Sequence, residues 1–245
     1  MSIEDFDPQY LKSKTILITG VSKGIGKALC EKLLDLGNIV IGTSRELSDL
    51  QEISLKFPRN FYPYSLELEN INQITTLAEY IEKDFDKLDV LFNNAGIIDW
   101  SDFENVEPKS FADVYEVNVI GAFMVMRNSL KTLHQNSHIK SRIINLSSRL
   151  GSIELRGNTQ LGGALAYQCS KAALNMLTRQ TSLELKPKGI SVISMSPGWV
   201  KTDMGRKNAK YEIDQSVTMI LSVLQSLADE ETGIFIGEDG ERIPW

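Results

Sequence analysis

The chain has 245 residues, of which 42% are hydrophobic and 24% charged, and it carries a net charge of −6. This composition excludes a disordered protein, and the length suits a single α/β domain over residues 1–245. The acidic balance argues against a general surface for nucleic acid or anionic membrane, and no apolar run approaches the ~18 residues of a membrane span. Because residues 1–10 lack the apolar core of a signal peptide, we expect a cytoplasmic protein.

Short β-rich runs alternate with longer helical patterns along the whole chain. Strands are expected at 15–19, 39–43, 61–66, 89–93, 142–147, 190–196 and 234–236, and helices at 25–36, 46–56, 70–85, 108–133, 164–185 and 217–227. Pro63 interrupts the third strand and places it nearer a sheet edge. The alternation predicts a Rossmann-type, doubly wound parallel sheet of about seven strands with helices on both faces. Ligands of such sheets bind at the carboxyl ends of the strands.

A glycine-rich loop follows the first strand and opens the first helix. Its glycines permit a tight turn and a close approach of the backbone to a pyrophosphate, which the helix N-terminus attracts. The alternative is a structural turn without a ligand. On the first interpretation the loop predicts a dinucleotide site formed by Gly20, Ser22, Lys23, Gly24, Ile25 and Gly26.

The second strand ends in Ser44 and Arg45, without the acidic residue that NAD-selective sites usually present to the ribose. Arg45 and Lys23 can instead address a 2′-phosphate. We therefore expect NADP(H), with NAD(H) the less favoured cofactor. If Arg45 only caps a solvated turn, the preference stays undecided.

Tyr167 and Lys171 are four residues apart at the start of a long helical pattern. Helical spacing puts them on one face, where an ammonium would lower the pKa of the phenol from ~10 toward neutral. Both residues are common, so an isolated match would be an ordinary amphipathic pair.

The glycine loop, the run Asn93-Asn94-Ala95-Gly96 and the pair Tyr167-x3-Lys171 occur together at the expected spacing. In this combination the chain resembles the short-chain dehydrogenase/reductase family over nearly its whole length. The resemblance implies hydride transfer between NADP(H) and a ketone, aldehyde or secondary alcohol. It also implies a cofactor contact by further residues: Asn94, Ala95, Gly96, Pro197, Gly198, Val200, Thr202, and, near the adenine, Glu67 and Leu68.

The family pattern also implies a catalytic set of Asn118, Ser148, Tyr167 and Lys171, in which Tyr167 and Lys171 contact the cofactor as well. Ser147 is the alternative to Ser148. Glu67 stands where the family usually has Asp, which leaves that contact open. In the family mechanism Ser148 holds the substrate oxygen, Tyr167 donates the proton, Lys171 holds ribose hydroxyls and Asn118 binds a water of a proton relay.

Two departures point to a narrower group. Tyr167 follows Ser148 by 19 residues, where many members have about 13, so residues 154–163 are expected to form a longer loop at the rim. The segment from Met204 to the next helix is short, which predicts a small substrate lid. Both features resemble the carbonyl-reductase-like members grouped with sniffer and the C-factor signalling protein.

Other functions are weighed beside this one. An NADP-binding signalling or redox-sensing protein with little turnover is the alternative, although the catalytic set is intact. A nucleotide-sugar epimerase or dehydratase fits neither the glycine spacing nor the small lid. His134 and His138 lack a third ligand nearby, so no metal site is expected. Helices 108–133 and 164–185 are apolar on more than one side, which with the resemblance predicts a homodimer or homotetramer.

Overall fold

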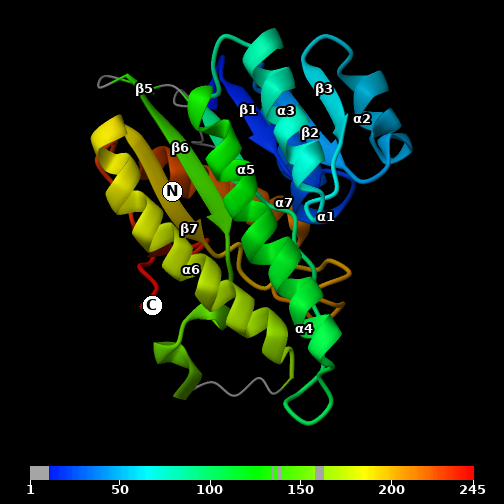
Figure 1. The fold of residues 1–245 in the computed structure, drawn as a ribbon, viewed down its shortest axis with the longest axis vertical. Coiled ribbons are helices and arrows are strands. Elements are labelled where there is room, and N and C mark those ends of the chain that lie inside the picture. The colour runs from blue at the N-terminus through cyan, green and yellow to red at the C-terminus, as the bar shows by residue number, and fades with distance from the viewer. Residues whose placement is uncertain (1–10, 134, 137–138, 158–162) are drawn as a thin grey trace.

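The computed structural model describes residues 11–133, 135–136, 139–157 and 163–245 (Figure 1). Its sheet has the strand order β3-β2-β1-β4-β6-β7-β8, and every neighbouring pair is parallel. The prediction of a seven-stranded, doubly wound sheet is confirmed, with the Pro63 strand at one edge. A two-residue strand, β5, pairs antiparallel with β6 and was not expected. The bounds are β1 Thr15–Ile18, β2 Ile39–Ser44, β3 Phe61–Ser65, β4 Val90–Asn93, β5 Gln135–Asn136, β6 Ile139–Leu146, β7 Ile190–Met195 and β8 Ile234–Ile236.

Alternating side chains of the strands form two separate cores, one on each face of the sheet. Ile16 and Ile18 pack toward α1 (Gly24–Asp35) and α7 (Ile213–Ser226), with α2 (Gln51–Lys56) at the side. Leu17 packs on the opposite face, toward α3 (Ile71–Asp84), α5 (Ala122–Asn128) and α6 (Leu165–Leu185). Figure 1 shows this second layer in front of the sheet and α1 and α7 behind it.

The expected helix 108–133 is not continuous. It consists of α4 (Pro108–Tyr115), a π-helical turn (Glu116–Gly121), α5 and a 3₁₀ turn (Ser129–Lys131). At the end of the π-helical turn the chain lies so close to Leu68 that a Cβ on Gly121 would come 2.7 Å from the Leu68 Cβ. The turn contains Asn118, and π-helical turns are frequent at functional sites.

Two other helices differ from their expected bounds. The first half of the expected helix 46–56 is a 3₁₀ turn, Leu47–Leu50, and only Gln51–Lys56 is α-helical. The last helix begins at Ile213 rather than Val217, because Glu212 and Gln215 form a capping box that starts it one turn earlier.

The side of α6 that faces the sheet carries polar groups among its apolar ones. The Thr178 hydroxyl accepts hydrogen bonds from Asn145 Nδ2 and the Ser194 hydroxyl, both at 2.9 Å. Asn145 Oδ1 in turn accepts from Asn93 Nδ2 at 2.8 Å. These groups are buried, so their hydrogen bonds offset the penalty of removing them from water. The network joins β4, β6 and β7 to the helix that carries Tyr167.

The carboxyl ends of β1, β4, β6 and β7 lie at one edge of the sheet because adjacent strands are parallel and in register. The segments that follow them, residues 19–24, 94–101, 147–153 and 196–211, therefore meet there. No helix of the described residues is long and apolar enough to span a membrane.

Candidate active site

The glycine-rich loop is pressed against the segment that follows β4. Gly20 and Gly24 have positive φ angles of 73° and 61°, a conformation that other residues adopt at a penalty. Asn94 Nδ2 donates to the carbonyls of Thr19 and Gly20, both at 2.8 Å. A Cβ on Gly26 would overlap the Gly20 carbonyl oxygen and Asn94 Nδ2. The structure thus brings the predicted loop and Asn94 together.

Thr19 holds this junction and was not among the expected site residues. Its hydroxyl accepts hydrogen bonds from the backbone N–H groups of Asn94 and Ala95, both at 3.1 Å. A hydroxyl residue at the last position of a strand, next to a glycine loop, was the available signal in the sequence. The first turn of α1 lies just beyond, and its N-cap residue, Lys23, makes no side-chain cap. Its N–H groups remain available to an anion.

The two residues expected to contact a 2′-phosphate, Arg45 and Lys23, differ in whether they have an acid partner. Arg45 is exposed, and its guanidinium has no acid partner among the described residues. Lys23 instead forms an exposed ion pair with Asp203, at 2.6 Å. An acid does approach the end of β2: the buried Ser44 hydroxyl donates to Asp49 Oδ2 at 3.2 Å. Asp49 lies four residues after Arg45, where the sequence pattern did not place an acid.

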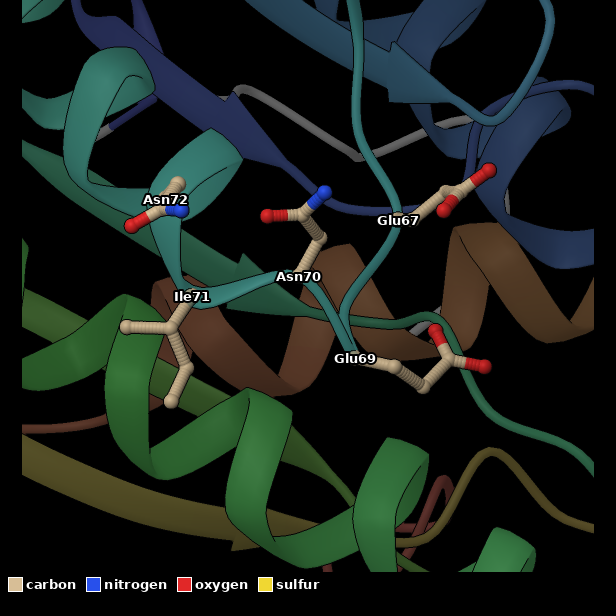
Figure 2. A pocket seen from close by; sticks show the side chains of 5 residues that line it. All are labelled: Glu67, Glu69, Asn70, Ile71 and Asn72. Carbon is tan, nitrogen blue, oxygen red and sulfur yellow. The ribbon is translucent and has the colours of Figure 1, made fainter.

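Glu67 and Leu68 lie on the connection between β3 and α3. Leu68 is buried against Gly121, and Glu67 is exposed. Glu67 borders an open hollow of about 610 Å³ together with Glu69, Asn70, Ile71 and Asn72. Figure 2 shows the two glutamates on the connection and Asn70 to Asn72 at the start of α3. This hollow does not include the residues of the catalytic set.

Tyr167, Lys171 and Ser148 converge at the ends of β6 and α6. The phenol of Tyr167 is hydrogen-bonded to the Ser148 hydroxyl. Lys171 Nζ lies 5.6 Å from the centre of the Tyr167 ring and donates to the Leu146 carbonyl at 2.8 Å. Ser147 is directed elsewhere: its hydroxyl donates to Asn175 Oδ1 at 2.7 Å. The geometry therefore places Ser148, and not Ser147, beside the phenol.

The pKa of Tyr167 differs from the sequence-based expectation. We expected Lys171 to lower it, but burial raises the pKa of Tyr167 to about 12, and the hydrogen bond from Ser148 offsets only part of this rise. Burial also lowers the pKa of Lys171 to about 8. Both side chains are almost fully removed from water, and desolvation disfavours the charged form of each.

Asn118 is held by three hydrogen bonds of its side chain. Its Oδ1 accepts from the Ile97 N–H at 2.8 Å, and its Nδ2 donates to the Ile97 carbonyl at 2.9 Å and to the Ser170 hydroxyl at 3.0 Å. The Ser170 hydroxyl donates to the Tyr167 carbonyl at 2.8 Å. Asn118 thus ties the segment after β4 to α6, and Ser170 is a second contributor that the sequence reasoning missed. A Cβ on Gly96 would come 3.0 Å from Asn118 Oδ1, so a larger residue there would require this amide to shift.

The segment after β7 carries the last of the expected cofactor contacts. Gly198 has a φ of +80° and packs on Glu238, and the Pro197 carbonyl accepts from the Ser216 hydroxyl at 2.7 Å. Val200 pairs with Tyr211. The Thr202 methyl carbon would lie 3.6 Å from a Cβ on Gly24, so Thr202 borders the glycine-rich loop. Thr202 therefore places the segment after β7 next to the glycine-rich loop.

Within the described residues, no group of three histidine, cysteine or acidic side chains is placed to hold a metal ion. His134 and His138 lie outside the described residues, as does most of the expected rim loop, residues 158–162.

Comparisons with known proteins agree with this geometry. The C-signal of Myxococcus xanthus is 38% identical over 159 residues, which are 64% of this chain and 93% of that protein. The structure of an NADPH-bound carbonyl reductase from chicken fatty liver superposes with a TM-score of 0.88 at 34% identity, covering 96% of this chain and all of that one. The carbonyl reductase Sniffer of D. melanogaster gives a TM-score of 0.86 at 32% identity, covering 95% and 100%.

The expected kinship with carbonyl-reductase-like proteins is thereby confirmed. The sequence pattern described as short chain dehydrogenase matches residues 14–212, from just before β1 to the capping residue of α7. This chain belongs to the short-chain dehydrogenase family.

Proposed function

We propose that this chain is an NADP(H)-dependent oxidoreductase that reduces a ketone or aldehyde to an alcohol, or catalyses the reverse reaction, with Tyr167 as general acid and base. One arrangement carries the proposal: the Tyr167 phenol is bonded to the Ser148 hydroxyl with the Lys171 ammonium beside its ring. A proton donor, an oxygen-binding hydroxyl and a cation at one point are what the reduction of a carbonyl requires.

The loop and the helix after it suit the cofactor. Gly20 and Gly26 let the loop pack closely against Ala95 and Asn94, and the N-terminus of α1 is available to a phosphate. Arg45, without an acid partner among the described residues, supports a 2′-phosphate contact at the end of β2. The carboxylate of Asp49 would repel a 2′-phosphate, but it already accepts a hydrogen bond from Ser44. When bound, NADPH supplies the hydride and leaves as NADP⁺.

The chain's own residues supply orientation and the proton. Ser148 is placed to donate a hydrogen bond to the substrate oxygen, in exchange for its present bond to the phenol. With its pKa raised to about 12, the Tyr167 phenol stays protonated well above neutral pH, and it can give its proton to the developing alkoxide. Lys171 then stabilises the phenolate that forms. Asn118 keeps Ile97 and α6 in place around the reacting groups.

The test is the substitution Tyr167→Phe, which removes the proton donor and keeps the ring. We expect turnover of a panel of ketones and aldehydes with NADPH to fall by about two orders of magnitude or more, with NADPH binding retained. Tyr80→Phe, on α3, is the matched control and should leave turnover unchanged. Normal turnover by the Tyr167→Phe protein would disprove the assignment.

The similarity to the C-signal favours one second candidate, an NADP-binding signalling protein with little turnover. The hydrogen bond between Tyr167 and Ser148, with the buried Lys171 beside the phenol ring, supports the enzyme instead. If the wild-type protein binds NADPH but consumes none of it over the whole carbonyl panel, the signalling function is the better explanation.

A further inference from the structure

A cation and an aromatic ring from the segments that follow two different strands are stacked on each other. The guanidinium carbon of Arg206 lies 4.2 Å from the centre of the Trp100 ring. Trp100 belongs to the segment that follows β4, and Arg206 to the segment that follows β7. Neither residue is used by the reaction described above.

Trp100 is held directly beside the catalytic helix. The Ala164 N–H donates to the Trp100 carbonyl at 3.2 Å, and the Leu165 N–H donates to the Ser101 carbonyl at 3.1 Å. A Cβ on Gly163 would come 2.8 Å from the same Trp100 carbonyl, so the chain there is tightly packed. Ala164 and Leu165 precede Tyr167 by less than one helical turn. The backbone of Trp100 is therefore fixed beside the start of α6, close in sequence to Tyr167.

Arg206 is fixed on the cofactor side. Its N–H donates to the Thr202 carbonyl at 2.8 Å, and Thr202 borders the glycine-rich loop. Trp199 Nε1 donates to the Gly205 carbonyl, also at 2.8 Å, which holds the same turn. Arg206 has a φ of +62°, in the left-handed region that favours glycine. An arginine in this conformation carries about 1 kcal/mol or more of backbone strain.

The stacked guanidinium keeps its donors free. Among the described residues its side chain has no ion-paired or hydrogen-bonded acceptor, and the nearby Asp203 is paired with Lys23. Stacking on a ring occupies the face of a guanidinium and leaves the N–H groups in its plane directed outward. Such a planar pair of donors matches a carboxylate, which accepts two parallel hydrogen bonds.

We propose that Arg206, oriented by Trp100, is a specificity-determining residue that selects carbonyl substrates bearing a carboxylate group. This inference rests on the proposed function for its kinetic readout. The carboxylate binds the edge of the guanidinium while the indole supports its face, and the carbonyl of the same molecule lies toward Tyr167.

The kinetic test compares 4-acetylbenzoate with its methyl ester, which keeps the ketone and the ring and removes the charge. In the wild-type protein kcat/KM should favour the acid, and Arg206→Gln should lower that preference by about tenfold to a hundredfold. The kcat/KM for the ester and the dissociation constant of NADPH should stay within about twofold. Lys207→Gln, the neighbouring exposed cation, is the matched control and should keep the acid preference.

Arg206→Gly guards against a folding artefact, because glycine suits the left-handed backbone at this position and should fold at least as stably. It should lose the acid preference as Arg206→Gln does. Equal losses for acid and ester, a weakened affinity for NADPH, or the same loss in Lys207→Gln would each overturn the proposal.

A binding measurement separates this inference from the proposed function. Calorimetric titration of the NADPH complex with benzoate and with benzamide needs no turnover. We expect benzoate to bind more tightly than benzamide in the wild-type protein and equally weakly in Arg206→Gln. If no ketone is reduced but benzoate still shows this dependence, the proposed function fails and the Arg206 assignment stands. If the two probes bind alike in the wild-type protein, the assignment is wrong.

Discussion

At the scale of single residues, Lys171 belongs to the candidate site and also makes the free energy of unfolding depend on pH. Its ammonium is almost fully buried, which lowers the pKa of Lys171 from 10.5 to about 8. Between these two pH values the unfolded chain holds a proton that the folded protein has released. Stability therefore rises with pH through this window, while below pH 8 the full penalty of burying the charge is present.

We predict that Lys171→Met removes this rise. Relative to the variant, the wild-type protein should gain about 2 kcal/mol in the free energy of unfolding between pH 7 and 9.5. The raised pKa of Tyr167 acts only above pH 10, outside this window. Urea unfolding at the two pH values measures the difference. The exposed Lys188→Met is the control, and a flat difference for Lys171→Met would mean that the ammonium keeps its ordinary pKa.

Arg45 is the residue on which the choice of cofactor depends. Arg45→Asp should reverse the local charge and lower the ratio of kcat/KM for NADPH over NADH by tenfold or more, since a charge-assisted contact to the 2′-phosphate becomes a repulsion. Arg59→Asp makes the same charge change before β3, away from the strand ends, and should leave the ratio unchanged. A constant ratio in both variants would assign the preference to other groups.

At the scale of elements, the turn from β1 into α1 depends on the absence of a side chain at Gly26. We predict that Gly26→Ala lowers the free energy of unfolding by about 2 kcal/mol or more, because its methyl group would overlap the Gly20 carbonyl oxygen and Asn94 Nδ2. NADPH binding, followed by fluorescence titration, should be lost with it. Gly157→Ala is the control, since nothing lies within 4 Å of a Cβ there. Unchanged stability in Gly26→Ala would show that the loop and Asn94 can separate.

Elements with a strong local pattern were predictable from the sequence. The apolar strands, the edge position of the Pro63 strand and the order of helices all follow from periodicity and from single residues that interrupt it. The interruption of helix 108–133 at Asn118 was not predictable, since the π-helical turn depends on Leu68 and Ile97, which approach from distant parts of the chain. The early start of α7 was visible in Glu212 and Gln215, and the sequence reasoning overlooked it.

The site shows the same division. The glycine spacing predicted the loop that packs against Asn94, and the Tyr167–Lys171 pair predicted two side chains that lie together beside Ser148. The hydrogen bonds of Thr19 and Ser170, the approach of Asp49 to Ser44 and the raised pKa of Tyr167 each depend on burial or on contacts between elements. Neither burial nor contacts between distant elements can be read from the sequence alone.

At the scale of the whole molecule, the outer faces of the helices around the π-helical turn and of α6 remain apolar and exposed. Ile120, Phe123, Met176 and Leu183 are each more than a third exposed, although α6 packs beside this turn. We infer that two copies pair through these faces, giving a homodimer or homotetramer.

The oligomeric state tests this inference. We expect light scattering after gel filtration to give a dimer or tetramer for the wild-type protein and a shift toward monomer for Phe123→Glu, which places a charge in the apolar face. Phe103→Glu, on an exposed loop, introduces the same charge outside that face and should not change the mass. A monomeric wild-type protein would contradict the assignment.

The polar side of α6 has a consequence for how the chain avoids a wrong structure. Apolar contacts are not directional. A wholly apolar helix could therefore pack on the sheet shifted by one turn, about 5.4 Å, and still bury a similar apolar area. Here such a slip would leave Thr178, Asn145 and Ser194 buried without their hydrogen bonds. The network therefore favours a single register of α6 on the sheet. That register sets the position of Tyr167 relative to Ser148, so the proposed proton donor is positioned by hydroxyl and amide groups away from the proposed site of reaction.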